Sequence, residues 1–444
     1  MLLATRPLGT VATMTTTATV SARQPVGSAA GTLVRSLVVT AAFIVPALAV
    51  RLTGLHPNPV VSLLVYGAAV VAASFVLAWA AEAAQIDVSG GLAIAVLALI
   101  AVLPEYAVDL YYAYTAGHAP QYAQYAAANM TGSNRLLMGL GWPLVVLVGF
   151  AVARKPGDRG RLALSLEPGN RVELGFLLFA GVLAFVVPAS GQIHILLGAA
   201  LLAWFGFYLY KLTRGDVEEP HLIGTAAAIG ALPDRVRRSV VIGLFAVAAT
   251  VILVCAEPFA QSLIGAGTEL GVDRFLLVQW LAPLASEAPE FIIAILFAAR
   301  GKGTAAIATL ISSKVNQWTL LMGSLPVAYM IGGGGSALRL DERQVAEVLL
   351  TATQTMMGVA LILSLRFSRG AAWALLGLFI VQFPITSTPG RLILCGAYIL
   401  VAGTVLILNG RCLPAALIAP FVDHAKRHGG HPHELLSAQT SVRA

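Results

Sequence analysis

The sequence predicts an all-α protein that crosses the membrane many times. Of its 444 residues, 58% are hydrophobic and only 11% are charged, so a soluble fold of this size would have too few charges to cover its surface. The apolar residues also gather in stretches of about 20, which is the length of a helix that crosses a bilayer. We therefore predict a polytopic membrane protein with about ten to twelve helices, surrounded by lipid.

Twelve apolar stretches are long enough to be candidate helices. They lie near residues 34–54, 59–84, 89–115, 121–152, 172–190, 192–213, 239–266, 273–299, 304–331, 345–366, 371–388 and 391–409. Differences in composition along the chain divide it into five parts. The predicted parts are a disordered cytoplasmic tail at 1–33, a first transmembrane half at 34–213, a cytoplasmic linker at 214–238, a second half at 239–410 and a cytoplasmic tail at 411–444.

The basic residues predict that both termini lie in the cytoplasm. With the N-terminus inside, the alternation of spans places most Lys and Arg residues in inner loops, as the positive-inside rule expects. These are Arg6, Arg23, Arg35, Arg154, Lys155, Arg159, Arg161, Arg235, Arg237, Arg238, Arg300, Lys302, Arg366, Arg369, Lys426 and Arg427. The exceptions are Arg51, Arg339, Arg343 and Arg391. The net charge of +7 thus reflects topology, and we expect a protein of the plasma (inner) membrane with no nucleic-acid partner.

A Pro-Glu pair lies in the middle of two apolar stretches, in AVLPE ending at Glu105 and in SEAPE ending at Glu290. A carboxylate at the bilayer centre costs about 3 kcal/mol or more unless it is paired or hydrated, so two such residues predict an ion pathway. Pro104 and Pro289 should break or kink their helices just before the glutamates and free backbone carbonyls. Carboxylate and carbonyl oxygens suit Na⁺ or Ca²⁺, and we predict that Glu105 and Glu290 bind the metal cation.

The two Pro-Glu units are predicted to be inverted relative to each other. In the predicted topology the helix of Glu105 runs outward and that of Glu290 runs inward, and Glu82 and Glu257 stand at equivalent points of the preceding spans. Inverted repeats that meet near the midplane are typical of alternating-access transporters, whereas channels usually form around an oligomeric axis. An enzyme is not expected, because no nucleophile-base or metal motif of an intramembrane enzyme is present.

These residues resemble the sodium/calcium exchanger (cation/Ca²⁺ antiporter) superfamily. Each of its two inverted alpha repeats carries a Gly-Thr-Ser-x-Pro-Glu helix followed by a Gly-Ser-Asn helix, and the resemblance covers roughly 59–152 and 239–331. It implies that Glu105 and Glu290 bind the cation. It also implies a wider set of ligands, which are Asn129, Ser133, Asn134, Ser286, Ser313 and Gln317.

The sequence departs from the family pattern at several ligand positions. The Thr-Ser pair of the first motif is replaced by Ala101 and Val102, the serine of the second motif by Glu287, and the asparagine of the second Gly-Ser-Asn by Lys314. Calcium prefers six to eight oxygen ligands, and a nearby base opposes a divalent ion. The sequence therefore argues against a high-affinity calcium site of the usual kind.

Two basic residues, Arg135 and Lys314, lie within the polar spans, and each is expected to face a carboxylate because an unpaired internal base is costly. We predict that Lys314 pairs with Glu287 or Glu290, either to compete with the cation and couple protons or as a structural salt bridge. Asp109 could be a second ligand or a relay toward the outside. Glu82 and Glu257 could line the access path or pair with Arg135.

The sequence thus predicts a membrane cation antiporter that works by alternating access and exchanges Na⁺, or another monovalent cation, for H⁺. Na⁺/Ca²⁺ exchange, Ca²⁺/H⁺ exchange and an inactive homologue remain alternatives. No cofactor is expected beyond the transported ions Na⁺, H⁺ and possibly Ca²⁺, and no oligomeric state follows from the sequence. Cys255, Cys395 and Cys412 have no metal or disulfide spacing and are expected to be apolar filler.

Overall fold

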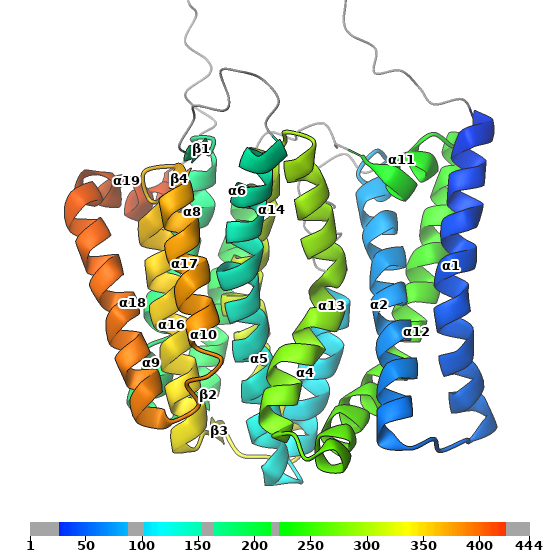
Figure 1. Ribbon diagram of the computed structural model, residues 1–444, viewed down its shortest axis with the longest axis horizontal. Helices are drawn as coiled ribbons and strands as arrows, with labels where there is room; N and C mark the ends of the chain where they lie inside the picture. Colours follow the sequence, from blue (N-terminus) through cyan, green and yellow to red (C-terminus); the bar gives the residue numbers. More distant parts are fainter. Residues whose placement is uncertain (1–25, 88–101, 153–162, 215–221, 423–444) are drawn as a thin grey trace, which may run out of the picture.

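The protein is a bundle of long helices that run side by side, as the computed structural model shows (Figure 1). The structure describes residues 26–87, 102–152, 163–214 and 222–422. Several predicted features lie outside these ranges. They are residues 1–25 and 423–444 of the tails, 89–101 of the predicted third helix, 215–221 of the linker, and the loop residues Arg154, Lys155, Arg159 and Arg161.

The helices of the first half are α1 (Val26–Thr53), α2 (Pro59–Ala84), α4 (Leu103–Ala116), α5 (Ala123–Leu136), α6 (Trp142–Val152), α8 (Asn170–Leu183), α9 (Val186–Ser190) and α10 (Ile195–Leu212). The helices that follow are α11 (Gly224–Gly230), α12 (Asp234–Leu270), α13 (Arg274–Ala299), α14 (Gly303–Asn316), α15 (Met322–Ile331), α16 (Glu342–Ile362), α17 (Arg369–Val381), α18 (Thr388–Asn409) and α19 (Leu413–Ile418).

The all-α membrane fold is confirmed. Within the described ranges, nine helices are long and apolar enough to cross a membrane, and α17 is a shorter apolar helix. Each of the twelve predicted stretches contains a helix. Boundaries differ in places: α1 begins at Val26, inside the predicted tail, and α12 begins at Asp234, inside the predicted linker. Asp234 follows Pro233 and puts a negative charge in the first turn of α12, where the helix dipole favours it.

Two short antiparallel ribbons were missing from the predictions. Strand β1 (Ala163–Ser165) pairs with β4 (Arg366–Ser368), and β2 (Gln192–His194) pairs with β3 (Ala337–Arg339). The ribbons lie at opposite ends of the bundle (Figure 1). The stretches 192–213 and 345–366 were wrongly assigned wholly to helix, because strands of three residues are too short to show an alternating pattern. The predicted helix 371–388 was likewise too long, since α17 ends at Val381, ahead of Pro384.

The two repeats share an unusual irregularity. A π-helical segment, Leu137–Gly141, joins α5 to α6, and a second one, Gln317–Leu321, joins α14 to α15. The first composite helix runs upward in Figure 1 and the second runs downward. The inverted-repeat architecture is therefore visible in the local backbone. Single π turns inside α-helices are frequent at functional sites.

Helices α5 and α13 cross in very close contact. A Cβ atom added to Gly132 on α5 would lie 1.7 Å from the backbone oxygen of Gln279 on α13. Only a glycine permits this approach, since any larger residue would push the two backbones apart. The crossing brings a polar segment of the first repeat against the Pro-Glu helix of the second.

An ion-pair cluster joins α2 to α12 at the upper end of the bundle in Figure 1. Asp87, just after α2, accepts hydrogen bonds from Arg237 Nε (2.7 Å) and Nη2 (2.8 Å) and from Arg238 Nε (2.9 Å). The hydrogen bond from Arg237 is the largest cause that lowers the pKa of Asp87 from 3.8 to about 2. The folded state therefore favours the ionised carboxylate.

Asp87 is expected to make the stability of the protein depend on pH in acid. Because its folded-state pKa is depressed, the stabilisation is present above about pH 3.8 and is lost as the pH falls toward about 2. We expect the melting temperature of the wild type to fall across this window. Asp87→Asn should melt lower at neutral pH and lose less on acidification, and an identical pH profile for both proteins would contradict the assignment.

Candidate functional site

Four carboxyl groups from the two repeats gather between α4 and α13. Glu105 and Asp109 stand one turn apart on α4 and share a face, and Glu287 and Glu290 stand on α13. Glu105, Asp109 and Glu287 are buried and Glu290 is partly buried. Glu105 interacts electrostatically with Asp109 and Glu290, and Glu287 interacts with Glu105. The two Pro-Glu units thus meet at one place.

The two prolines behave differently. Helix α4 begins at Leu103, so Pro104 lies in its first turn and Glu105 lies where the helix dipole favours a negative charge. Of the predicted break or kink at Pro289, the break is wrong, because α13 continues without interruption from Arg274 to Ala299, and the kink stays a prediction. In a bilayer an unsatisfied backbone group costs several kcal/mol, so a helix that carries a proline is still favoured over an open chain.

Polar side chains of the second repeat contact the carboxyls of α13. Ser313 Oγ donates to Glu290 Oε1 at 2.9 Å, and Gln317 Nε2 donates to Glu287 Oε1 at 2.7 Å. Glu287 Oε2 and Gln317 Oε1 have no hydrogen-bond partner among the described residues. Ser286 is turned to its own helix, where it donates to the backbone oxygens of Ala282 and Pro283. Ser313 and Gln317 are therefore better placed than Ser286 to share a cation with the glutamates of α13.

The polar residues of the first repeat lie on α5 opposite α4. The Asn129 side chain interacts with Asp109, although neither side chain has a hydrogen bond of standard geometry within the described part of the chain. Ser133 Oγ donates to the Asn129 backbone oxygen at 2.8 Å, and Asn134 Nδ2 donates to its own helix. Asn134 therefore turns its side-chain oxygen outward. Glu105 Oε1 is a further buried oxygen without a partner among these residues.

Lys314 pairs with Asn134 and not with a glutamate. Its Nζ donates to Asn134 Oδ1 at 2.8 Å and to the Asn134 backbone oxygen. No ion pair with Glu287 or Glu290 is found in the described ranges, so the predicted pairing is wrong. Lys314 and Asn134 occupy equivalent positions before the two π segments, and the inverted symmetry therefore brings them face to face. The amine still interacts at longer range with Glu287 and Glu105.

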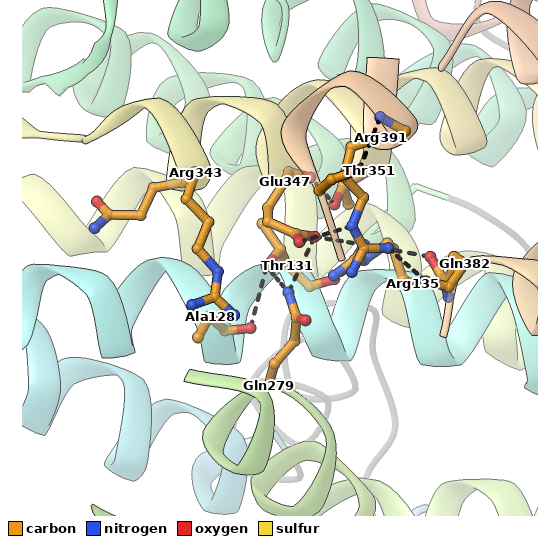
Figure 2. Close-up of polar contacts among 12 residues, drawn as sticks. Ala128, Thr131, Arg135, Gln279, Arg343, Glu347, Thr351, Gln382 and Arg391 are labelled. Atoms are coloured by element: carbon orange, nitrogen blue, oxygen red, sulfur yellow. Dashed lines mark hydrogen bonds and ion pairs between the residues drawn. The ribbon is translucent and has the colours of Figure 1, made fainter. Parts of the chain in front are cut away.

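Arg135 pairs with a carboxylate that the sequence interpretation did not identify. Its Nη1 lies 2.6 Å from Glu347 Oε2 on α16, and both side chains are buried (Figure 2). The predicted pairing of Arg135 with Glu82 or Glu257 is therefore wrong. Glu257 pairs instead with Arg51 at 3.4 Å, and Glu82 is partly buried on α2.

Most of the arginines that the predicted topology places outside are paired with carboxylates. The pairs are Arg51–Glu257, Arg343–Asp273 (2.8 Å) and Arg391–Glu347 (3.1 Å). The positive-inside rule counts basic residues and not net charge, so these pairs do not account for the exceptions, but each of the three arginines has a carboxylate partner. Arg391 as an exception was the one sequence signal that pointed toward a buried acid near it.

A cavity of about 330 Å³ opens beside α1, α2 and α12, and Arg51, His56 and Gln261 are among its lining residues. None of the four carboxyls of the site lines it. Gln261 Nε2 donates to Tyr111 Oη on α4 (3.0 Å) and to Glu257 Oε1 (3.3 Å). Glu257 thus belongs to a polar surface between α12 and α4, and its place along an access path stays a prediction.

The donor set of the site is mixed. Within the described ranges, no group of three or more acidic, histidine or cysteine side chains is placed to hold a metal ion. A hard cation would therefore draw on amide and hydroxyl oxygens as well as carboxylates, a combination that suits Na⁺ or Ca²⁺. Such a site can bind a cation, a proton or both in turn.

Comparisons with known proteins agree with this arrangement. The family model for the sodium/calcium exchanger protein matches residues 58–214 and 240–385. The crystal structure of an H⁺/Ca²⁺ exchanger, CAX, is 37% identical and superposes with a TM-score of 0.82, covering 89% of this chain and 98% of that chain. The structure of native YfkE is 15% identical, with a TM-score of 0.59 and coverage of 82% and 99%, and shares the fold. No protein with a curated function matches the chain.

Proposed function

The chain belongs to the sodium/calcium exchanger family, and we propose that it exchanges calcium ions for protons by alternating access of the site between α4 and α13. The proposed role is transport and not catalysis. The observation that carries the proposal is the excess of carboxyls over cations: the buried Glu105, Asp109 and Glu287 and the partly buried Glu290 share the site with one amine, Lys314.

This excess of acid couples the two ions. An ionised carboxyl in a low-dielectric interior is too costly unless a proton or a cation neutralises it. A calcium ion and protons can therefore replace each other on the same oxygens. If only the neutralised site crosses between its two orientations, each crossing carries one kind of ion and exchange results without leak.

The arrangement of Lys314 supports a divalent cargo. Asn134 holds the amine by two hydrogen bonds, and one oxygen of each of two glutamates, Glu105 Oε1 and Glu287 Oε2, has no hydrogen-bond partner among the described residues. Asn129 and Gln317 add amide oxygens toward the six to eight that calcium prefers, and water can supply the rest. The similarity to a structure described as an H⁺/Ca²⁺ exchanger agrees with this choice.

A second candidate is exchange of Na⁺ or another monovalent cation for protons. The observation in its favour is the positive charge of Lys314, which interacts with Glu287 and Glu105 and lowers the negative charge available to an ion. The two candidates share the proton step and differ in the cation.

The proposed orientation places both chain ends in the cytoplasm of a cell with the protein in its plasma membrane. The start of α1 and helix α19 lie at the same end of the bundle, which supports a common side for the two ends (Figure 1). The Asp87–Arg237 cluster lies at this end too, with the basic start of α12.

Flux measurements in proteoliposomes test the proposal. We expect that a step of outside Ca²⁺ drives labelled calcium into vesicles while the lumen loses protons. Acidifying the outside relative to the lumen should drive calcium out again. Proton release driven by Na⁺ or K⁺ but not by Ca²⁺ would favour the second candidate. Sodium-driven calcium movement with no change of lumenal pH would refute proton coupling, and empty vesicles give the leak.

A further inference from the structure

A single buried carboxylate, Glu347, joins four parts of the structure. It belongs to α16 and is 2% exposed. Its Oε2 lies 2.6 Å from Arg135 Nη1 on α5 and accepts a hydrogen bond from Gln279 Nε2 on α13 at 3.3 Å, while its Oε1 lies 3.1 Å from Arg391 Nε on α18. Figure 2 shows the three side chains converging on it. We call Glu347, Arg135, Gln279 and Arg391 the Glu347 cluster.

The cluster reaches both halves of the site. Arg135 directly follows Asn134, which holds Lys314, and Gln279 precedes Glu287 and Glu290 on the same helix, α13. Gln279 is also the residue whose backbone touches Gly132 at the α5–α13 crossing. One carboxylate on a helix outside the two repeats thus contacts a helix of each repeat.

Further contacts fix the two side chains that matter most. Arg135 Nη1 donates to Gln382 Oε1 at 3.2 Å, and its guanidinium lies 4.9 Å from the centre of the Trp280 ring, also on α13. Gln279 Nε2 donates to Thr131 Oγ1 on α5 at 3.1 Å. Gln354, about two turns after Glu347 on α16, donates to the backbone oxygen of Arg135 at 3.4 Å. Arg135 lies just before the π segment. These side chains therefore link α5 to α13 directly and also link α5 to α16.

We propose that Glu347 is a positioning residue that fixes the register of α5 against α13, and with it the spacing between the ion-site groups of the two repeats. The inference rests on the proposed function for the position of the ion site. Its new element is that Glu347, a residue outside the two repeats, controls the geometry of that site. The chemistry is a charge shared by two guanidinium groups in a buried setting. Replacing Glu347 or Arg135 breaks the ion pair that ties α5 to α16 and leaves the other member with an uncompensated charge, whereas replacing Arg391 leaves the Arg135–Glu347 pair in place.

The cluster itself provides a matched comparison. Arg135 and Arg391 are both buried guanidinium groups on Glu347, but only Arg135 belongs to a helix of the site. Glu347→Gln and Arg135→Gln should each raise the KM for the transported cation by about tenfold or more, which corresponds to about 1.4 kcal/mol of lost binding. Arg391→Gln should lower the melting temperature and leave KM near the wild-type value. The double variant Glu347→Gln/Arg135→Gln replaces the ion pair by a neutral one and should recover part of the lost affinity.

A distance measurement tests the register without any flux. Spin labels at the exposed positions Gln121, at the start of the α5 segment, and Arg274, at the start of α13, would report their separation by electron–electron dipolar spectroscopy. We expect the distance distribution to shift or broaden in Glu347→Gln and not in Arg391→Gln. A failure of calcium/proton exchange would leave this readout intact. An unchanged distance together with an unchanged KM in Glu347→Gln, at lowered melting temperature, would overturn the inference and leave a purely structural ion pair.

Discussion

Replacing Glu290 by glutamine is expected to lower exchange in proteoliposomes by about 100-fold or more, and Glu105→Gln should do the same. The carboxamide keeps the shape of the side chain and one oxygen but removes the charge that holds a cation and the group that carries a proton. Charge interactions in a low-dielectric site amount to several kcal/mol, and each 1.4 kcal/mol is a factor of ten. The Ser313 hydroxyl that donates to Glu290 can still donate to the amide oxygen, so the fold should survive.

The matched control is Glu269→Gln, the same chemical change at an exposed position near the end of α12. It should transport like the wild type. Initial rates are compared at equal amounts of folded protein, judged by monodisperse elution and melting temperature. Full exchange in both Glu105→Gln and Glu290→Gln would refute the assignment of the site.

Gly132→Ala is expected to destabilise the protein strongly. The new Cβ would lie 1.7 Å from the Gln279 backbone oxygen, so α5 and α13 must move apart. Overpacking of a core costs about 1–3 kcal/mol even where side chains can adjust, and here a backbone atom stands in the way. We expect a lower melting temperature and loss of exchange, because the crossing also aligns the two halves of the site.

Gly149→Ala provides the comparison on the same composite helix. Its Cβ would find Ala298 O at 4.0 Å, which is ordinary contact, and both substitutions raise helix propensity equally. Gly149→Ala should therefore melt near the wild-type temperature or above it. Equal melting temperatures and rates for the two variants would show that the α5–α13 crossing tolerates separation.

The helices could be predicted because the bilayer imposes a length and a composition on each of them. The same signal could not locate their exact ends, since Asp234 and Pro384 set boundaries by local capping and chain-breaking effects. The two ribbons, with three residues a strand, give no periodic signal at all. The existence of each helix, which composition controls, was therefore predictable. The exact helix ends, which single residues control, were less predictable.

The site divides in the same way. The meeting of Glu105 and Glu290 follows from a repeated motif and an inverted topology, and both are readable in the sequence. The pairing of Lys314 required knowing that equivalent positions of the two repeats face each other, and the choice of a carboxylate from charge alone was wrong. The contact of Arg135 with Glu347 joins residues more than 200 positions apart, and no local pattern connects them.

The two π segments limit where residues can be inserted into or deleted from this chain. A π turn holds one residue more than an α turn, and one residue corresponds to a rotation of about 100° around the helix axis. Leu137–Gly141 therefore acts as a phase shift between α5, which faces the ion site, and α6, which faces its own neighbours. Deleting one residue there would restore regular winding but turn one face away from its partners, whereas a loop would absorb the same deletion. In each composite helix, the direction in which the second part faces thus depends on the extra residue of its π segment.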